Sequence, residues 1–447
     1  MDRSREDVDQ ASSIRQVLGA SFIGTTIEWY DFFLYGTAAS LVFGQLFFPT
    51  GDPLVSTLSA LGTFAVGFVV RPLGGIIFGH YGDRLGRKTI LVLTLSMMGA
   101  ATFLIGCLPT FDQIGVLAPI LLVLLRVIQG LGVGGEWGGA ALMAVEYAPE
   151  DRRGYYGSWP QMGVPAGLLL STGIFSAVSF LPNEQFLAWG WRIPFLLSII
   201  LIGVGLFIRT RLLETPSFSE VQESQTESQM PIVEVFRNHP KNVFLAIGAR
   251  VASDGSFYVF SVFILDYATR TLGLPRSTIL LGVAIASAIE IFTIPLFGVV
   301  SDRTGRRPIY LVGTVLMLIL AYPYFLLIQT GSVVLVILAS VLGLSIAHAT
   351  MYGPMSAYFA ELFGTRVRYS GVSIGYQLAS IIGGGLGPLI ATYLVAAAGG
   401  SFWPVVAWMV ALCIITLVSV LVAAETFRGG EFLAEQSGER RTVAEQG

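Results

Sequence analysis

Eight ionisable side chains lie within long apolar runs of this 447-residue sequence. Five are acids and three are bases: Glu28, Asp31, Arg71, Arg126, Glu136, Arg250, Asp254 and Glu290. A buried charge is costly unless it is paired. Pairing every base would still leave two carboxylates, and a buried carboxylate without a partner binds a proton instead. The residue types therefore indicate reversible proton binding next to sites that hold a charged ligand.

The spacing of the acids predicts which of them act together. Glu28 and Asp31 are three residues apart, so on a helix they share one face. Glu136 lies in another apolar run, about 15 Å along a helix from Arg126 at 1.5 Å per residue. We expect Glu28, Asp31 and Glu136 to be the proton-coupling residues, with Asp31 or Glu136 as the carrier.

The bases predict anion binding. Arg126 is the first candidate, because a guanidinium stays charged and grips a carboxylate through two hydrogen bonds. Arg250 and Asp254 are four residues apart and could pair with each other or open to a ligand. Polar and aromatic side chains that could complete a binding site are Tyr35, Trp137, Gln161, Tyr258, Tyr352, Tyr376 and Gln377.

Several of these residues also have a structural interpretation. Arg71 and Glu290 could belong to a gating layer near one face, and Arg250 with Asp254 could be a purely structural pair. His348, a ninth ionisable residue in an apolar run, is expected to pack rather than to relay protons.

The composition shows what kind of element holds these residues. Hydrophobic residues make up 54% and charged residues 12% of the chain, whereas soluble domains carry about 25% charged residues. Apolar runs of the length that spans a bilayer as a helix occur twelve times, at about 17–43, 54–80, 88–108, 114–145, 157–181, 190–212, 242–267, 277–300, 308–329, 333–360, 370–397 and 401–424. We therefore predict an all-α membrane protein with 12 transmembrane helices.

Basic residues predict the orientation and the domains. With the N-terminus in the cytoplasm, 20 of the 26 Lys and Arg residues fall on that side and three on the other, a strong positive-inside bias. We expect both termini to be cytoplasmic. The expected divisions are a cytoplasmic tail (1–16), a six-helix half (17–213), a cytoplasmic linker (214–241), a second half (242–424) and a cytoplasmic C-terminal tail (425–447).

The two halves carry the same loop motif. The motif begins at Gly79 and again at Gly298, 219 residues later, and reads G-x-x-x-D-R-x-G-R-[KR] in both places. A second pair of charges, Glu146 with Arg153, recurs as Glu361 with Arg368. The repetition indicates two pseudo-symmetric halves around a site near the bilayer midplane. Charges of both signs at matching positions predict a cytoplasmic gate, formed by Gly79, Asp83, Arg84, Gly86, Arg87, Glu146, Arg153, Gly298, Asp302, Arg303, Gly305, Arg306, Glu361 and Arg368.

The duplicated loop resembles the hallmark of the major facilitator superfamily, and Arg126–Gly130 resembles its R-x-x-Q-G motif. Further segments are similar to the metabolite:proton symporter family, which includes shikimate, α-ketoglutarate, citrate and proline/betaine carriers. They are Glu28–Gly36, Arg71–Gly75, Gly134–Gly138, Gly190–Phe195 and Glu214–Phe218. The resemblance implies the major facilitator fold and a bacterial inner membrane location.

Together these observations predict a secondary transporter that imports a small organic acid or a related polar metabolite with protons, by alternating access. The alternative is a proton-coupled importer of zwitterionic osmolytes such as proline or betaine. An efflux carrier or a transport-inactive receptor is less favoured, and the span-five glycine–proline motif of antiporters is only partial at Gly163–Gly167.

Other classes of protein are excluded. The net charge of −3 does not favour nucleic acid binding. Gly130–Gly135 matches G-x-G-x-x-G, but it lies in an apolar span without the strand that a dinucleotide site needs. The chain has three histidines, two cysteines and no Walker motif. We therefore expect no enzyme activity, no metal, and no cofactor other than the proton as coupling ion. The expected partners are a carboxylate-like substrate and lipids, and the chain is expected to be monomeric.

Overall fold

The computed structural model describes residues 3–85, 87–134, 142, 144–145, 148–211, 237, 240–363 and 368–427. Within these ranges, the side chains of residues 3–17, 79–85, 87–88, 91, 208–211 and 368–370 are not described. The described chain is helical and contains no strand. Nine of its helices are long and apolar enough to cross a membrane, and two shorter apolar helices accompany them.

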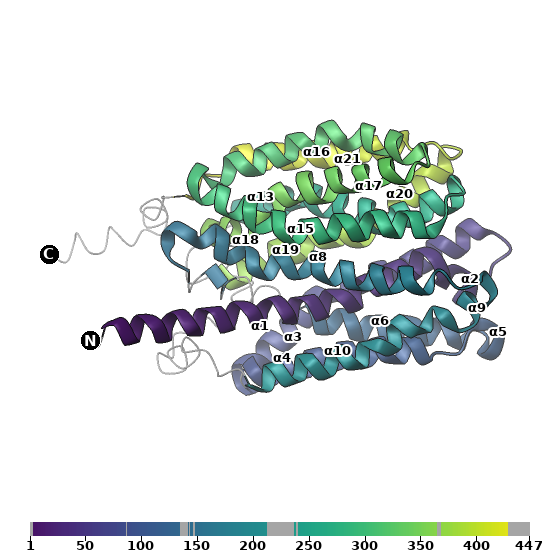
Figure 1. Cartoon of the computed structure of the whole chain (residues 1–447), viewed down its shortest axis with the longest axis horizontal. Coiled ribbons are helices and arrows are strands. Elements are labelled where there is room, and N and C mark those ends of the chain that lie inside the picture. The colour runs from purple at the N-terminus through teal and green to yellow at the C-terminus, as the bar shows by residue number, and fades with distance from the viewer. Residues whose placement is uncertain are drawn as a thin grey trace.

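The helices of the first half run back and forth along the long axis of the molecule (Figure 1). Its helical segments are α1 (Arg3–Ala38), η1 (Ala39–Phe43), α2 (Gly44–Phe47), α3 (Pro53–Leu85), α4 (Arg87–Cys107), α5 (Phe111–Ile114), α6 (Leu117–Val133), η2 (Glu150–Arg152), α8 (Arg153–Val178), α9 (Asn183–Gln185), η3 (Phe186–Gly190) and α10 (Arg192–Arg211). Helix α1 already begins at Arg3, within the segment expected to be a polar tail.

The second half repeats this arrangement. Its segments are α13 (Pro240–Tyr258), η4 (Val259–Phe263), α14 (Ile264–Asp266), η5 (Tyr267–Thr271), α15 (Arg276–Thr304), α16 (Arg306–Gln329), α17 (Val333–Ser340), η6 (Val341–His348), α18 (Ala349–Leu362), α19 (Arg368–Ser380), η7 (Ile381–Gly385), α20 (Leu386–Ala397) and α21 (Trp403–Val422). The π-helical segments η1 and η4 begin 220 residues apart, so the repeat extends to local helix geometry.

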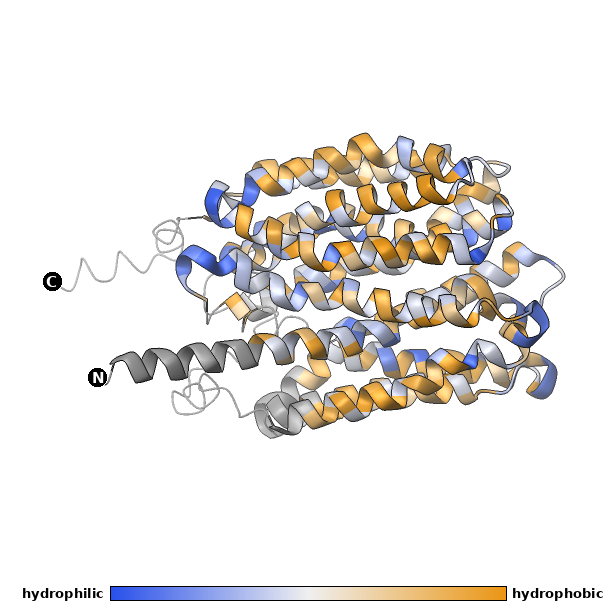
Figure 2. Cartoon of the chain, in the orientation of Figure 1, coloured by the Kyte–Doolittle hydropathy of each residue, from blue (hydrophilic) through white to orange (hydrophobic). Residues whose placement is uncertain are grey.

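Hydrophobic residues predominate along the helices of the bundle, and hydrophilic residues gather at its two ends (Figure 2). Phe244, Phe292 and Val334 are among the most exposed large apolar side chains. Such a surface is stable only against lipid, while helices satisfy their own backbone hydrogen bonds. The prediction of an all-α membrane protein is therefore confirmed.

The two halves meet along α8 and α3. Helix α8 packs against α1 of its own half and against α15 and α18 of the other half, and Figure 1 shows it along the boundary. Helix α3 packs against α19, η7 and α20. We call the end where α1 begins and α21 ends the terminal end, and the other the opposite end.

Glycines permit the close crossing of α8 and α15 at the terminal end. A Cβ atom on Gly154 would lie 2.5 Å from the Gly298 carbonyl oxygen, and one on Gly298 would lie 2.6 Å from the Gly154 oxygen. Gly298 is the first glycine of the repeated loop motif. The next motif glycine, Gly305, ends α15 at φ +101°, a conformation that other residues rarely adopt.

Candidate functional site

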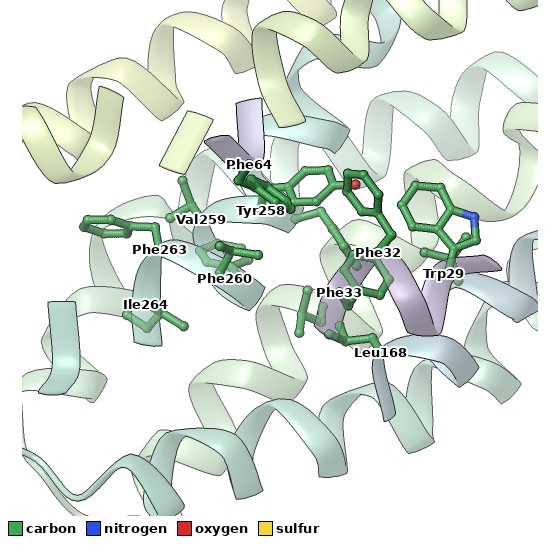
Figure 3. Close-up of a cluster of buried hydrophobic side chains, with 14 of the residues drawn as sticks. Trp29, Phe32, Phe33, Phe64, Leu168, Tyr258, Val259, Phe260, Phe263 and Ile264 are labelled. Carbon is green, nitrogen blue, oxygen red and sulfur yellow. The ribbon is translucent and has the colours of Figure 1, made fainter. Parts of the chain in front are cut away.

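A group of aromatic side chains from both halves occupies the middle of the bundle. Phe32 and Phe33 come from α1, Phe64 from α3 and Tyr258 from α13, and Figure 3 shows them converging. The Phe32 ring centroid lies 5.2 Å from that of Phe64, and Tyr258 lies 6.0 Å from Phe64. All four side chains are at most 3% exposed. Any charged group inserted here is therefore shielded from water.

Arg126 points into this aromatic group from α6 and is fully buried. Its Cζ atom lies 4.1 Å from the Phe32 ring centroid and 4.2 Å from that of Tyr35. Nη1 donates to Gln129 Oε1 (3.1 Å) and Nη2 donates to the Phe64 carbonyl (3.3 Å), whereas Nε finds no acceptor among the described residues. The structure thus places predicted residues Arg126 and Tyr35 together.

Arg71 of α3 contacts the same Phe32 ring. Its Cζ atom lies 4.1 Å from the ring centroid and 4.4 Å from that of Phe68, and the side chain is 1% exposed. Nε and Nη2 have no hydrogen-bond acceptor in the described part of the chain. No described carboxylate forms an ion pair with Arg71 or Arg126. The sequence analysis left open whether Arg71 belongs to a gating layer or to the substrate pathway. In the structure, Arg71 and Arg126 contact the same ring, that of Phe32.

Glu28 and Asp31 are both buried on α1, as the spacing predicts. Neither oxygen of Asp31 accepts a hydrogen bond from the described residues. The Thr102 hydroxyl faces this carboxylate, but it donates to the Met98 carbonyl (3.0 Å) and accepts from Gln129 Nε2 (2.8 Å). Gln129 thus connects Thr102, which faces Asp31, to Arg126.

In the second half, Arg250 and Asp254 form an ion pair at 2.7 Å, with both side chains at most 5% exposed. Ser380 donates to Asp254 Oδ2 (2.7 Å), and the Arg250 Cζ atom lies 3.3 Å from the Tyr376 ring centroid. The pair lies at a central cavity of about 10 Å³, which is lined by Trp29, Val164, Arg250, Asp254, Phe257, Tyr258, His348, Tyr352 and Tyr376. This volume is about that of one water molecule.

Two predicted binding residues connect the halves instead of lining the cavity. Gln161 of α8 donates to the Tyr352 carbonyl (3.4 Å), and Gln377 of α19 donates to the Gly134 carbonyl (3.1 Å). Predicted residues Glu136 and Trp137 lie outside the described residues.

Glu290 and His348 form a second buried contact in this half. His348 Nδ1 lies 2.5 Å from Glu290 Oε1, and the two residues are 2% and 0% exposed. The sequence analysis left Glu290 between a gating layer and the pathway and expected His348 to pack. It did not predict their contact, which joins α15 to η6 and leaves no local spacing pattern.

At the terminal end, Asp302 joins the halves. Its carboxylate accepts hydrogen bonds from the backbone N–H groups of Gly154 (2.7 Å) and Tyr155 (2.8 Å), at the start of α8. Arg306 is fully buried and pairs with Asp302 at 2.6 Å and with Glu361 at 3.3 Å. Three expected gate residues, Asp302, Arg306 and Glu361, thus form one network with the other half.

Two further expected gate residues, Arg153 and Arg303, make no contact with this network that the described residues show. Arg153 lies 3.7 Å from Glu150 rather than in this network, and Arg303 is exposed. The backbone or side chains of the remaining expected gate residues are outside the described parts: Gly79, Asp83, Arg84, Gly86, Arg87, Glu146 and Arg368.

Contacts that the sequence did not predict also join the halves at the opposite end. Arg270 pairs with Asp266 at 2.9 Å and donates to the Pro53 carbonyl of α3 (3.1 Å). Arg276 donates to Ser179 and Asn183 of the first half, at 3.2 and 3.1 Å. One sequence signal could have identified these two arginines: they are among the three basic residues expected at this end. Among the described residues, contacts between the halves are therefore present at both ends.

The sequence matches the Major Facilitator Superfamily over residues 21–374 and 245–444. It is 43% identical to the shikimate transporter of Escherichia coli over 429 residues, covering 95% of this chain and 98% of the relative. The chain belongs to the major facilitator superfamily. This facilitator is also 41% identical to an inner membrane metabolite transport protein of Escherichia coli (93% and 95% covered).

A third relative is the glycine betaine/proline/ectoine/pipecolic acid transporter of Dickeya dadantii, at 37% identity with 92% and 84% of the chains covered. Among solved structures, the facilitator is similar to a D-xylose–proton symporter, with a TM-score of 0.71 and 19% identity over 92% of this chain and 98% of the other. The fold of two six-helix halves is therefore shown, and the facilitator is a membrane transporter of small molecules rather than an enzyme.

Proposed function

We propose that this facilitator imports a small organic carboxylate together with protons by alternating access. The observation that carries the proposal is the pair of buried guanidinium groups, Arg71 and Arg126, that contact one phenylalanine ring without a described carboxylate partner. Both belong to the same closed, water-poor region.

The energetics favour an anionic ligand at these arginines. Because each Cζ atom lies 4.1 Å from the Phe32 centroid, the two charges are at most about 8 Å apart and repel by about 2 kcal/mol or more at an effective dielectric constant of 20. Removing each ion from water costs several kcal/mol more, whereas a desolvated cation–π contact returns about 2 kcal/mol. A carboxylate that accepts from the unpaired N–H groups of Arg71 and Arg126 offsets this cost. Shikimate, named for the relative of 43% identity, carries such a carboxylate.

Protonation of Asp31 would couple transport to the proton gradient. A buried carboxylate without an ion pair is stable in its protonated form, and Thr102, which faces Asp31, is joined through Gln129 to Arg126. We include Glu28 and Glu136 in the same proton-coupling group. Protonation of these acids and substrate binding would together permit the occluded state, and both would be released on the other side.

The positive-inside bias supports a cytoplasmic location for both termini and for the linker at 214–241. The terminal end, with the Asp302–Arg306–Glu361 network, would then be the cytoplasmic gate. Nothing in the fold requires a second copy of the chain, so we propose that one chain is the transporting unit.

Uptake of zwitterions is the second candidate. The Arg250–Asp254 pair supports it, because a zwitterion could exchange partners with both members of an ion pair. The nearby Tyr352 and Tyr376 rings could face a quaternary ammonium group. Named relatives transport proline and betaine.

The test is uptake into proteoliposomes at a series of external pH values. Radiolabelled shikimate, α-ketoglutarate, proline and glycine betaine are supplied one at a time. We expect accumulation of a carboxylate that increases as the external pH falls, and loss of this dependence in Asp31→Asn. Asp112→Asn removes an exposed acid by the same substitution and should behave as the wild type. Preference for proline or betaine would favour the second candidate, and pH-independent accumulation would contradict proton coupling.

A further inference from the structure

The Glu290–His348 contact lies in the second half of the molecule. The proton-coupling residues proposed above, Glu28, Asp31 and Glu136, all belong to the first half. Glu290 comes from the middle of α15, and His348 is the last residue of the π-helical segment η6. Nδ1 and Oε1 are 2.5 Å apart, within hydrogen-bond distance, and both groups can bind a proton. Among the described residues, Glu290 Oε2 has no hydrogen-bond partner. The imidazole is thus the main polar contact of this carboxylate.

The surroundings of the pair are aromatic. The His348 ring is stacked on Tyr352, with centroids 4.9 Å apart, and lies 4.7 Å from Phe257. His348 itself lines the central cavity. A change of charge on the imidazole would therefore act directly on the central cavity.

The other titratable groups at the cavity already have partners or are neutral. From α13 these are Arg250, Asp254 and Tyr258; from α18, Tyr352; and from α19, Tyr376. Helix α16 also packs against η6 and α18 and carries Tyr310 and Tyr324. Arg250 pairs with Asp254. Tyr310 donates to the Ala249 carbonyl, and Tyr324 packs on Phe260 at 4.0 Å. Helix α8 contributes only Val164 to the cavity.

Counting protons shows what the closed cavity requires. A carboxylate beside a neutral imidazole would leave one buried negative charge, which is strongly unfavourable. One added proton makes the pair neutral, either as a carboxylate with imidazolium or as a carboxylic acid with imidazole. The occluded state therefore favours the pair with one proton, and water entering an open cavity would stabilise the charge left when that proton departs.

We infer that Glu290 and His348 form a second proton-binding site, which takes up a proton from water on one side and releases it to water on the other. This inference rests on the proposed proton symport and places one coupling site in each half. The π-helical geometry of η6 supports it, since π-helical segments are often found at functional sites.

Transport measurements separate this role from a structural one. The probe is whichever of shikimate, α-ketoglutarate, proline or glycine betaine the wild type concentrates. Glu290→Gln keeps a hydrogen-bonding side chain but cannot lose a proton. We expect it to lose accumulation driven by a pH gradient while it retains exchange of labelled for unlabelled compound at equal pH. Ser345→Ala is the matched control, because Ser345 also joins η6 to α15, through the Ala286 carbonyl at 2.7 Å, without a titratable group.

Other transport results would overturn the inference. Wild-type accumulation in Glu290→Gln would show that the carboxylate does not carry the proton. The double variant Glu290→Gln, His348→Gln contains no titratable group at the site. Loss of both accumulation and exchange in the single and the double variant would show a structural role. A wild type that concentrates none of the four compounds would contradict the proposed function instead.

A measurement without substrate tests the site directly. The chain contains three histidines, so the protein purified without a histidine tag and labelled with ¹⁵N-histidine gives few imidazole signals, and His348→Gln identifies one of them. We expect Glu290→Gln to change the ¹⁵N chemical shifts of the His348 ring at neutral pH, because Nδ1 loses its carboxylate partner. Ser345→Ala should leave these shifts unchanged. Wild-type ring shifts in Glu290→Gln would overturn the inference.

Discussion

At the scale of single residues, the arrangement of Arg71 and Arg126 distinguishes this transporter's centre from an ordinary buried ion pair. Both guanidinium groups lie 4.1 Å from the centroid of Phe32 and retain N–H groups without an acceptor among the described residues. Positive charge and planar geometry are both available to a ligand.

Replacing either arginine by lysine should separate these two properties. Arg126→Lys and Arg71→Lys keep the charge but lose the flat donor array. For a carboxylate substrate we expect kcat/KM to fall by about 30-fold or more, in line with the 2–5 kcal/mol cost of disrupting a buried charged contact. Initial uptake rates against substrate concentration measure the change. Arg152→Lys, at an exposed side chain, should have no effect. Equal activity in Arg126→Lys would argue against direct carboxylate binding.

At the scale of helices, the crossing of α8 and α15 requires glycine on both sides. Gly154→Ala or Gly298→Ala would place a methyl group against the carbonyl oxygen of the opposing helix. Overpacking of this kind costs roughly 1–3 kcal/mol, so the closed terminal end should become roughly 5- to 150-fold less populated. Gly173→Ala, in the same α8, meets nothing within 4 Å and is the control.

Spin labels can measure this opening. Cysteines at Arg152 and Arg303, both exposed at the terminal end, would be labelled in a variant without Cys107 and Cys413. We expect a longer inter-label distance in Gly154→Ala and the wild-type distance in Gly173→Ala. The same short distance in all variants would mean that this crossing does not control closure.

At the scale of the whole molecule, the described structure has contacts between the halves at both ends. Asp302 accepts from the start of α8 at the terminal end, and Arg270 donates to the Pro53 carbonyl at the opposite end. The central cavity holds about 10 Å³, so a substrate can enter only after one of these ends opens.

Breaking one end should therefore leave the other closed. Asp302→Asn weakens charge-assisted hydrogen bonds and should lengthen the distance between labels at Arg152 and Arg303 only. Arg270→Gln should lengthen the distance between labels at Glu184 and Thr271, which are exposed on the two halves at the opposite end. Spin-label distances in both variants test this. Simultaneous lengthening at both ends in either variant would contradict rigid-body alternating access.

The sequence alone was sufficient for features that depend on composition or on one helix. Long apolar runs predict spans because a bilayer excludes unpaired backbone groups, and the repeated loop predicts two similar halves. The Arg250–Asp254 contact follows from i, i+4 spacing, since helix geometry brings such residues together.

Contacts between helices could not be obtained in this way. Arg71 and Arg126 meet at Phe32, Glu290 meets His348, and Asp302 reaches the backbone of Gly154, all across segments distant in sequence. Helix periodicity shows which residues share a face, but not which faces of two helices meet or at what height. Those relations depend on how the side chains of the assembled bundle pack, so the cationic centre, the buried histidine pair and the closure at the opposite end became visible only in the folded molecule.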